Sequence, residues 1–318
     1  MNLPQMSTLR EVCLKEEWQM QPSIIVHGGA WDIPPELHEA HRQGVRRAVE
    51  AGWAVLSTGG SARDAVEAAI VVMEDDETFD AGRGSFLNAD GQVELDAGFM
   101  DGAELQVGAV AGVQFIRNPI RLARAVMEKS EHVLLIAQGA QRFAQKMGFP
   151  TCDLTDLAVP REFERWQKLL YDRTYSARKS FTHATDTVGC VALDQAGHIA
   201  AGTSTGGTPN KMPGRVGDVP MVGCGFYADD QLGGASTTGW GEAIAKVLLA
   251  RLALHALQDL GDPRAAARAA IQVLADKVNG LGGVILLSPE GQPGWYHNTP
   301  HMAYAYRTAQ MDELTVSL

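Results

Sequence analysis

The sequence predicts an α+β fold in which antiparallel β-sheets are stacked and covered by helices. Candidate strands and helices occur in runs along the chain and do not alternate one by one, as they would around a parallel sheet. The composition is globular, with 45% hydrophobic and 20% charged residues. Eleven of the 34 glycines lie between residues 202 and 241, which indicates that backbone segments approach one another closely there. We expect one domain over residues 1–318, because layered folds reach this length.

The first half of the chain is predicted to begin with a buried strand and two helices. The run SIIVH at 23–27 is rich in β-branched residues and is followed by two glycines, which is typical of a buried strand entering a turn. Apolar residues at helical spacing predict a helix over 34–58, and Ser61 with Asp64 has the capping pattern that begins a second helix. The other elements expected here are strand fragments such as 93–96, a strand at 106–113, two helices within 120–147 and a short helix around 162–170.

The second half is expected to follow a polar, basic segment at 172–186, which predicts an exposed connector. Residues 187–193 and 198–203 then form the two strands of a hairpin around a turn at 194–197. The remaining expected elements are strands at 221–227 and 235–238, helices at 241–260 and 263–278, and a closing β meander at 284–287, 295–298 and 303–308.

Charge and hydropathy restrict the partners that this protein is expected to have. Its 38 acidic and 27 basic residues leave a net charge of −11, which opposes binding to nucleic acid or to an anionic membrane surface and favours a small or cationic partner. The chain has no apolar run long enough for a transmembrane helix, and residues 1–23 lack the apolar core of a secretory signal. We therefore expect a cytoplasmic protein whose four scattered cysteines are reduced thiols: Cys13, Cys152, Cys190 and Cys224.

Two short segments resemble known catalytic motifs. Residues 202–206 read G-x-S-x-G, so Ser204 is one candidate nucleophile of a serine hydrolase. That motif has to lead directly into a helix, and two prolines follow here instead, which disfavours it. His38 and His41 do not complete an HExxH zinc motif, and we expect both on a solvated helix face.

A second group of segments begins at the end of the connector. By itself a threonine at the start of a strand, such as Thr187, indicates only β propensity. Its companions supply hydroxyl groups, a guanidinium, a carboxylate and glycine backbone N–H groups, which amide hydrolysis requires. These segments are DTVG at 186–189, TSTGG at 203–207, KMPGRVGD at 211–218 and TGWGE at 238–242.

Three earlier segments complete the pattern, namely HGGA at 27–30, FDAGRGSFLN at 79–88 and VELDAGFMDG at 93–102. Together the segments closely resemble the plant-type L-asparaginase and isoaspartyl peptidase family of N-terminal nucleophile hydrolases, in the order of that family. The resemblance implies a four-layer αββα sandwich, self-cleavage before a threonine, and assembly of two α/β units into a dimer of heterodimers. The cut would fall between Asp186 and Thr187 and leave an α fragment, 1–186, and a β fragment, 187–318.

The implied chemistry agrees with the residue types. A threonine hydroxyl is a poor nucleophile until a base removes its proton, and cleavage before Thr187 creates that base as the residue's own α-amine. Unperturbed α-amines have pKa values of about 7.7–8.0, so a useful fraction is neutral at neutral pH. Thr187 Oγ would then attack the side-chain amide of asparagine or the isopeptide carbonyl of a β-aspartyl dipeptide, and water would resolve the acyl-enzyme.

The resemblance also implies roles for the residues around the nucleophile. Thr205 would hydrogen-bond the Thr187 hydroxyl, while the Thr238 hydroxyl and the Gly239 N–H would stabilise the oxyanion. Capping of the following helix is the alternative role of Thr238. The two roles of Thr238 are compatible with each other.

The substrate itself is expected to be held by charged groups. Arg215 would bind its α-carboxylate and Asp218 its α-ammonium, although these two side chains could instead pair across a surface turn. Gly241 would let the substrate backbone approach closely. Asp80 stands where the family more often has Asn, which would place a second negative charge near the site.

No metal or organic cofactor is expected to take part in catalysis. The resemblance does imply a structural sodium ion, which hard-cation chemistry permits because backbone carbonyls are suitable ligands. Its carbonyls would come from Met73, Glu74, Asp76, Phe79, Ala81 and Arg83.

Two other functions stay open. A glycosylasparaginase of the same superfamily would remove a sugar-linked amine from asparagine. A noncatalytic homologue would keep the fold as a binding module, and its chain would stay uncut. The sequence does not rank asparagine against β-aspartyl dipeptides, because both present the same aspartyl half.

Overall fold

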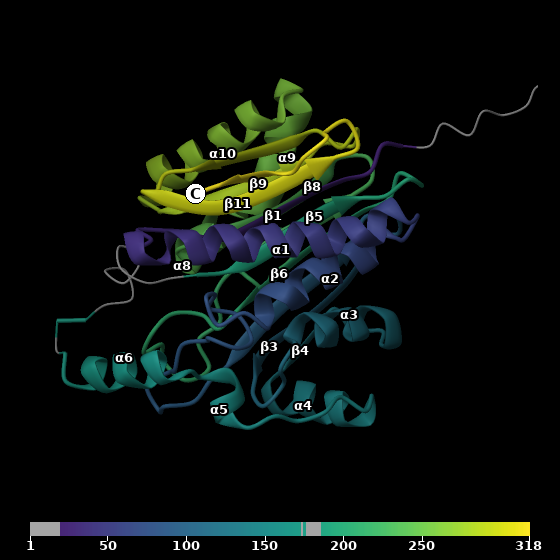
Figure 1. Ribbon diagram of the computed structural model, residues 1–318. Helices are drawn as coiled ribbons and strands as arrows, with labels where there is room; N and C mark the ends of the chain where they lie inside the picture. The colour runs from purple at the N-terminus through teal and green to yellow at the C-terminus, as the bar shows by residue number, and fades with distance from the viewer. Residues whose placement is uncertain (1–19, 173, 176–185) are drawn as a thin grey trace, which may run out of the picture.

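The protein has a mixed α+β fold with two β-sheets and flanking helices, so the predicted α+β class is confirmed (Figure 1). The computed structural model describes residues 20–172, 174–175 and 186–318. Cys13 and most of the expected connector lie outside the described residues.

The larger sheet has the strand order β12-β11-β1-β5-β6-β2-β3-β4, and the smaller sheet has the order β10-β9-β8-β7. The larger sheet is made of β1 (Ser23–Trp31), β2 (Leu95–Asp101), β3 (Gln106–Val113), β4 (Leu134–Ile136), β5 (Val188–Leu193), β6 (Ile199–Thr205), β11 (His301–Thr308) and β12 (Thr315–Ser317). The smaller sheet is made of β7 (Phe226–Asp229), β8 (Gly233–Gly239), β9 (Gly282–Leu287) and β10 (Pro293–His297).

One strand pair departs from the antiparallel arrangement that we expected. β3 and β4 are parallel, because helix α3 (Pro119–Lys129) carries the chain back between them. A parallel pair needs such a crossover, whereas an antiparallel pair can be joined by a short turn. The wholly antiparallel prediction is therefore wrong at this edge of the larger sheet.

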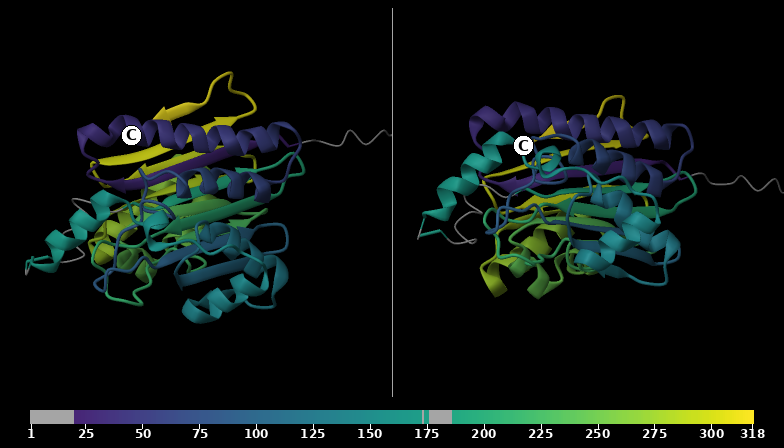
Figure 2. Two further views of the ribbon diagram at one scale, coloured as in Figure 1. Left: turned by 60° about the horizontal axis from the view of Figure 1, so that its bottom comes forward. Right: turned by 90° about the horizontal axis from the view of Figure 1, so that it is seen from below.

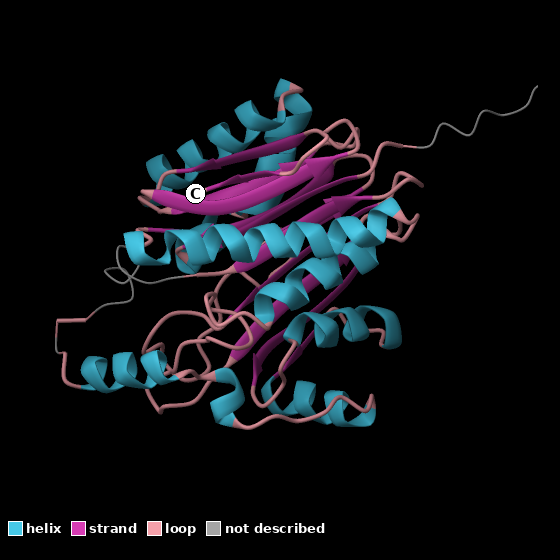
Figure 3. Ribbon diagram, viewed as in Figure 1, coloured by secondary structure: helices cyan, strands magenta, loops and turns pink. Residues whose placement is uncertain are grey.

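Three apolar clusters hold the sheets and helices together. Along β1, Ile24 and Val26 face one cluster and Ile25 faces another, because successive side chains of a strand point to opposite faces. The first cluster lies between the larger sheet and helices α1, α2 and α3, the second contains residues of both sheets, and the third lies between the smaller sheet and α8, α9 and α10. Figures 2 and 3 show the strands in the interior with helices on both outer sides. The bounds of the other helices named here are α1 (His38–Ser57), α2 (Ala62–Glu74), α8 (Gly241–Val247), α9 (Leu249–Leu260) and α10 (Pro263–Val278).

The remaining described helices lie in the segment before the nucleophile candidate. They are η1 (Pro35–Leu37), α4 (Ala137–Lys146), α5 (Leu154–Leu157) and α6 (Pro160–Leu170). The predicted start of α2 is confirmed, since the Ser61 hydroxyl accepts a hydrogen bond from the Asp64 N–H at 3.2 Å.

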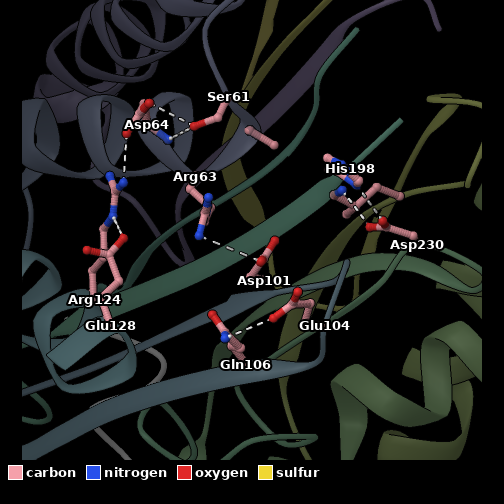
Figure 4. A network of polar contacts seen from close by, with 12 residues as sticks. Ser61, Arg63, Asp64, Asp101, Glu104, Gln106, Arg124, Glu128, His198 and Asp230 are labelled. Atoms are coloured by element: carbon pink, nitrogen blue, oxygen red, sulfur yellow. Dashed lines mark hydrogen bonds and ion pairs between the residues drawn. The ribbon is translucent and has the colours of Figure 1, made fainter. Parts of the chain in front are cut away.

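A polar network surrounds this cap (Figure 4). It lies where β2 ends and β6 begins, at the far end of β6 from Thr205. Arg63 of α2 lies 3.8 Å from Asp101 at the end of β2. His198 contacts Asp230 at 2.8 Å. The first pair joins α2 to β2, and the second joins the residue before β6 to the residue after β7.

Three predictions in the second half need correction. The expected strand at 221–227 is a turn followed by β7, and the expected helix at 241–260 is divided into α8 and α9 at Leu248, whose φ is +52°. The closing strands are not one meander, because β9 and β10 belong to the smaller sheet and β11 pairs with β1 in the larger one. This last pairing joins the two ends of the chain, which local sequence patterns do not specify.

Two simpler expectations concern cysteines and membranes. Cys190 and Cys224 are buried, Cys152 is half-buried, and all three are free thiols, as predicted. In the part of the chain that the structure describes, no helix is both long and apolar enough to cross a membrane.

Candidate active site

Thr187 and Thr205 lie side by side because they flank the two paired strands of the predicted hairpin. Val188 is opposite Ser204 in the antiparallel register, so Thr187, just before β5, lies next to the last residue of β6. The Thr187 hydroxyl donates to Thr205 Oγ1 at 3.1 Å. Thr205 Oγ1 also accepts from the Gly207 N–H at 3.0 Å, so its own hydrogen points toward another acceptor.

Two acceptors surround that hydrogen of Thr205. The carbonyl oxygen of Asp186 lies 3.3 Å from Thr205 Oγ1, and Asp80 Oδ2 lies 3.4 Å from it. Thr205 therefore connects the hydroxyl of Thr187 to the peptide bond that precedes it.

His27, the first residue of the HGGA segment, holds the other side of Thr187. Its Nδ1 lies 3.0 Å from the Thr187 carbonyl oxygen, and its Nε2 lies 2.9 Å from Ser236 Oγ. Because a carbonyl oxygen only accepts, Nδ1 carries the hydrogen and Nε2 accepts from Ser236. Burial lowers the pKa of His27 to about 3, so the ring is neutral at neutral pH and keeps this tautomer.

The two sheets approach closely at this point. A Cβ on Gly189 would lie 2.0 Å from Ser236 Oγ of the smaller sheet and 2.3 Å from His27 Nε2. Such a contact is impossible without movement of buried groups, so glycine is required there. The glycine of the DTVG segment thus lets the hydrogen bonds around Thr187 form.

A small pocket opens beside the two threonines. Gly239, at the end of β8, is part of its lining, whereas Thr238 is buried and is not. Gly239 has a φ of +134°, and a Cβ there would lie 2.4 Å from the Cα of Gly282. The lining residues are Thr187, Thr205, Gly207, Thr208, Arg215, Gly217, Asp218, Val219 and Gly239.

Arg215 is oriented by a residue for which we predicted no role. Its Nε and Nη2 donate to the two carboxylate oxygens of Glu242 at 2.8 and 2.9 Å. Burial opposes the charge of Arg215, but Glu242 outweighs it and raises the pKa of the guanidinium. The expected alternative pairing of Arg215 with Asp218 is therefore wrong, since Glu242 takes that place.

Asp218 lies deeper in the same pocket. Its Oδ2 accepts from the Thr237 hydroxyl at 2.9 Å, and burial raises the pKa of Asp218 to about 6. A Cβ on Gly241 would lie 2.8 Å from Asp218 Oδ1 and 3.0 Å from Arg215 Nη2. Gly241 therefore keeps open the space between the two charged side chains.

Asp80 lies behind Thr205 and is not part of the pocket lining. Its Oδ1 accepts from the Phe86 N–H at 2.9 Å. Burial raises the pKa of Asp80 well above its ordinary value, against the opposing charge of Lys211. These surroundings disfavour the second negative charge that we expected near the site.

Two expectations about exposure are wrong. Asp186 belongs to the connector that we expected to be exposed, and its exposed fraction is 4%. His41, expected on a solvated helix face, is fully buried and contacts Asp186 Oδ2 at 3.0 Å. The reason is visible in the spacing, because His41, Val45 and Val49 follow one another every four residues along the buried face of α1.

Ser204 has surroundings that do not suit a nucleophile. Strand alternation turns its side chain away from Thr205, and its hydroxyl donates to Glu74 Oε1 at 2.7 Å. Glu74 also accepts from the Ile120 N–H at 3.0 Å, and burial raises the pKa of Glu74 to about 8. Among the described residues, no hydrogen bond joins Ser204 to a histidine.

The expected sodium loop curls at the end of α2. Glu74 O accepts from the Arg83 N–H at 2.7 Å, and Asp76 O accepts from the Phe79 N–H at 3.2 Å. A Cβ on Gly84 would lie 2.5 Å from Phe79 O, so several carbonyls lie close together. Among the described residues, no group of three or more His, Cys, Asp or Glu side chains is placed to hold a metal ion.

Sequence reasoning missed four residues that support the site. His27 and Glu242 lie in the HGGA and TGWGE segments, but we predicted no contact for either. For Thr237 we predicted no role, although we predicted one for its neighbour Thr238. Lys211 is buried and donates to the Glu94 carbonyl oxygen at 2.7 Å, where Asp80 and other carboxylates surround its ammonium. The position of Lys211 in the glycine-rich KMPGRVGD segment was the one feature of the sequence that could have indicated its buried contact.

Comparison with known proteins finds consistent matches over most of the chain. The family model described as asparaginase matches residues 20–316. An isoaspartyl peptidase/L-asparaginase of Xenopus laevis is 46% identical over 286 residues, which cover 90% of this chain and 92% of that protein. The protein of the same name from Homo sapiens is 47% identical over 274 residues, with coverage of 86% and 88%. A plant-type L-asparaginase of Pyrococcus abyssi (strain GE5 / Orsay) is 44% identical over 308 residues, with coverage of 92% and 98%.

Proposed function

The chain belongs to the asparaginase family, as its motifs predicted, and on that premise we propose that it is a self-processing amidohydrolase. It hydrolyses L-asparagine to L-aspartate and ammonia and cleaves β-aspartyl dipeptides. The observation that carries the proposal is the contact of the Thr187 hydroxyl with Thr205 directly after the buried Asp186. The names of the relatives, isoaspartyl peptidase and L-asparaginase, support both substrates.

Self-cleavage begins with Thr187 Oγ attacking the carbonyl carbon of Asp186. The C–N bond breaks, the nitrogen of Thr187 takes the proton that the hydroxyl loses, and an ester joins the two residues. Water then hydrolyses this ester, leaving an α-carboxylate on Asp186 and a free α-amine on Thr187. Thr205, which contacts both the Thr187 hydroxyl and the Asp186 carbonyl oxygen, orients the reacting groups.

Turnover of substrate uses the groups that cleavage releases. The neutral α-amine of Thr187 takes the proton of its own hydroxyl, and Oγ attacks the side-chain carbonyl carbon of the substrate. The amine or ammonia leaves with that proton, and water hydrolyses the acyl-enzyme to aspartate. The Gly239 N–H and the Thr238 hydroxyl stabilise the oxyanion, where one donor contributes about 10²–10³ in rate.

Recognition of the aspartyl half relies on the two charged residues of the pocket. Arg215, with Nη1 left free by Glu242, binds the α-carboxylate, and Asp218 binds the α-ammonium. Gly241, which carries no side chain between them, admits the substrate backbone. The leaving group determines whether the product is ammonia or an amino acid.

The proposal extends to the architecture of the mature protein. The three apolar clusters support the four-layer αββα sandwich, with fragments 1–186 and 187–318 remaining together. Two such α/β units form a dimer of heterodimers in the cytoplasm. Crowded carbonyls in the loop after α2 are compatible with a structural sodium ion, held by the backbone of Met73, Glu74, Asp76, Phe79, Ala81 and Arg83.

Denaturing intact-mass spectrometry tests the proposal directly. Purified protein is incubated for several days at neutral pH, and the smaller product is sequenced from its N-terminus. Two masses with a fragment that begins Thr-Val-Gly-Cys, together with release of ammonia from L-asparagine, are expected. A single persistent mass would contradict self-processing and favour an uncut binding module.

A further inference from the structure

We propose that His41 is a positioning residue for self-cleavage, which holds the side chain of Asp186, the residue before the scissile bond, in one orientation. The inference rests on the proposed function, because it concerns the cut between Asp186 and Thr187. It goes beyond that function because it gives a histidine that lies 145 residues earlier in the chain a role in setting the rate of self-cleavage.

The hydrogen bonds of His41 define what its ring offers to Asp186. Nδ1 lies 2.9 Å from the Leu37 carbonyl oxygen, and Nε2 lies 3.0 Å from Asp186 Oδ2. The carbonyl oxygen can only accept, so Nδ1 carries a hydrogen. A favourable contact at Nε2 then needs a second hydrogen, either on His41 or on the Asp186 carboxyl. The pair therefore holds one proton between two side chains that are 0% and 4% exposed.

Two aromatic rings hold the imidazole of His41 in place. The ring of Phe79 packs edge-on at a centroid distance of 5.4 Å, and that of Trp31 packs similarly at 6.0 Å. Phe79 belongs to the FDAGRGSFLN segment, and Trp31 ends β1. The position of Nε2 is therefore set by packing as well as by the hydrogen bond to Leu37.

Gly29 holds the opposite side of the Asp186 carboxylate. It has a φ of +93°, and a Cβ there would lie 1.5 Å from Asp186 Oδ1. The carboxylate therefore lies directly against the backbone of the HGGA segment, in space that only glycine leaves open. Between Gly29 and His41 the side chain of Asp186 has one position.

The orientation matters because the same residue carries the carbonyl that Thr187 attacks. The carbonyl oxygen of Asp186 is contacted by Thr205 at 3.3 Å, and that of Thr187 is contacted by His27 at 3.0 Å. With His41 on the side chain of Asp186, three contacts position the two residues on either side of the scissile bond. A misplacement of about 1 Å between reacting groups can cost about 100-fold in rate. After the cut Asp186 ends the other fragment, so the contact no longer aligns Thr187.

The charges around the pair favour the proton that the two side chains share. Burial opposes the charge of His41, but the hydrogen bond and charge of Asp186 outweigh it and raise the pKa of His41. Burial also raises the pKa of Asp186, against the effects of His41 and Arg161. Both directions agree with the 3.0 Å contact between Nε2 and Oδ2.

Two substitutions of His41 separate the contact from the space that the ring fills. In His41→Gln the amide nitrogen reaches the place of Nε2 and keeps a donor toward Asp186, whereas in His41→Asn it reaches only the place of Nδ1. His38→Asn is the matched control, since His38 lies one turn earlier on α1 and contacts Ile33 O at 2.8 Å. Freshly purified precursors are followed by intact mass over time at neutral pH, and the kcat/KM of fully processed enzyme is measured separately.

We expect His41→Asn to slow cleavage about 10-fold or more, while fully processed enzyme keeps the wild-type kcat/KM. His41→Gln, which keeps the donor, should cleave at nearly the wild-type rate, and His38→Asn should behave as wild type. Equal rates for His41→Asn and wild type would overturn the inference, as would a His41→Gln variant that is as slow as His41→Asn.

Folding is checked by the melting temperature of each precursor. If His41→Asn does not fold, Asp186→Ala removes the same contact from the other side and is expected to slow cleavage similarly; a wild-type rate there would overturn the inference. A wild-type chain that never cleaves contradicts the proposed function itself, whereas a wild type that cleaves beside equally fast variants contradicts only the role of His41.

Discussion

Glu242 contacts Arg215 through both carboxylate oxygens, with Nε at 2.8 Å from Oε1 and Nη2 at 2.9 Å from Oε2. Paired hydrogen bonds of this kind fix the plane of a guanidinium as well as its position. Gly217 and Gly241 lie beside the same group, and a Cβ on either would be within about 3 Å of its nitrogens. Arg215, which we propose as the residue that binds the substrate carboxylate, is thus oriented by Glu242.

Removal of the Arg215 side chain should lower turnover more than removal of the Glu242 charge. Arg215→Ala is expected to lower kcat/KM for L-asparagine by about 10- to 100-fold or more, because the substrate carboxylate loses a charged donor. Glu242→Gln keeps Arg215 but loosens its orientation, so a smaller loss that falls mainly on KM is expected. Steady-state kinetics of fully processed enzyme measures both, and unchanged kcat/KM in Arg215→Ala would remove that residue from the site.

The choice of nucleophile is tested by two hydroxyl deletions. Thr187→Ala should remain one uncut chain without activity, because the attacking oxygen is missing. Ser204→Ala should be cut and active, since the Ser204 hydroxyl only donates to Glu74. Intact mass and an ammonia-release assay distinguish the two. Normal processing of Thr187→Ala would contradict the mechanism, and an inactive but cut Ser204→Ala would favour the serine-hydrolase alternative.

Binding of the product L-aspartate is expected to weaken in acid. Asp218, whose pKa burial raises to about 6, must be ionised to accept from the α-ammonium. As the pH falls below that value, the inhibition constant should rise up to about tenfold per pH unit. The α-amine of Thr187 stays protonated below about pH 7, so it does not contribute to this trend. The trend should vanish in Asp218→Asn; a pH-independent constant in the wild type would contradict the role of Asp218.

Stability should decrease as the pH rises, because of Glu74. Burial raises its pKa from 4.5 to about 8 in the folded protein. Between these values the folded state keeps a proton that the unfolded state releases, so the free energy of unfolding falls with rising pH, by roughly a few kcal/mol in total. Glu74→Gln still accepts from Ser204 and Ile120 through its Oε1, and should lack this contribution. Urea unfolding of the wild type and of Glu74→Gln at pH 5 and pH 8 measures this contribution. An equal change in the free energy of unfolding between the two pH values in both proteins would contradict the prediction.

Replacement of sodium by a bulky organic cation tests the proposed structural ion. The carbonyls of the loop after α2 would then lose the ion that they bind. The melting temperature should fall by a few degrees as a result. Restoring sodium should restore it, whereas the same concentration of choline should not. An unchanged melting temperature across these salts would argue that the loop is held by its own hydrogen bonds, such as that from Arg83 N–H to Glu74 O.

Local sequence patterns were enough to predict most of the elements, and the motifs were enough to predict the family. The strand predicted at 106–113 coincides with β3, the helix predicted at 263–278 coincides with α10, and Ser61 caps α2 as expected. Thr187 and Thr205 could be placed near each other because a short hairpin joins their strands, and hairpin register follows from the turn. Each of these features depends on residues that are close in the chain.

Contacts between side chains that are distant in the chain could be found only in the folded protein. The pairing of β11 with β1, the burial of His41 against Asp186 and the orientation of Arg215 by Glu242 each join residues from separate elements. Local spacing determines backbone conformation and which face of an element is apolar. It does not determine which other element covers that face, because this depends on how all the apolar clusters pack at once.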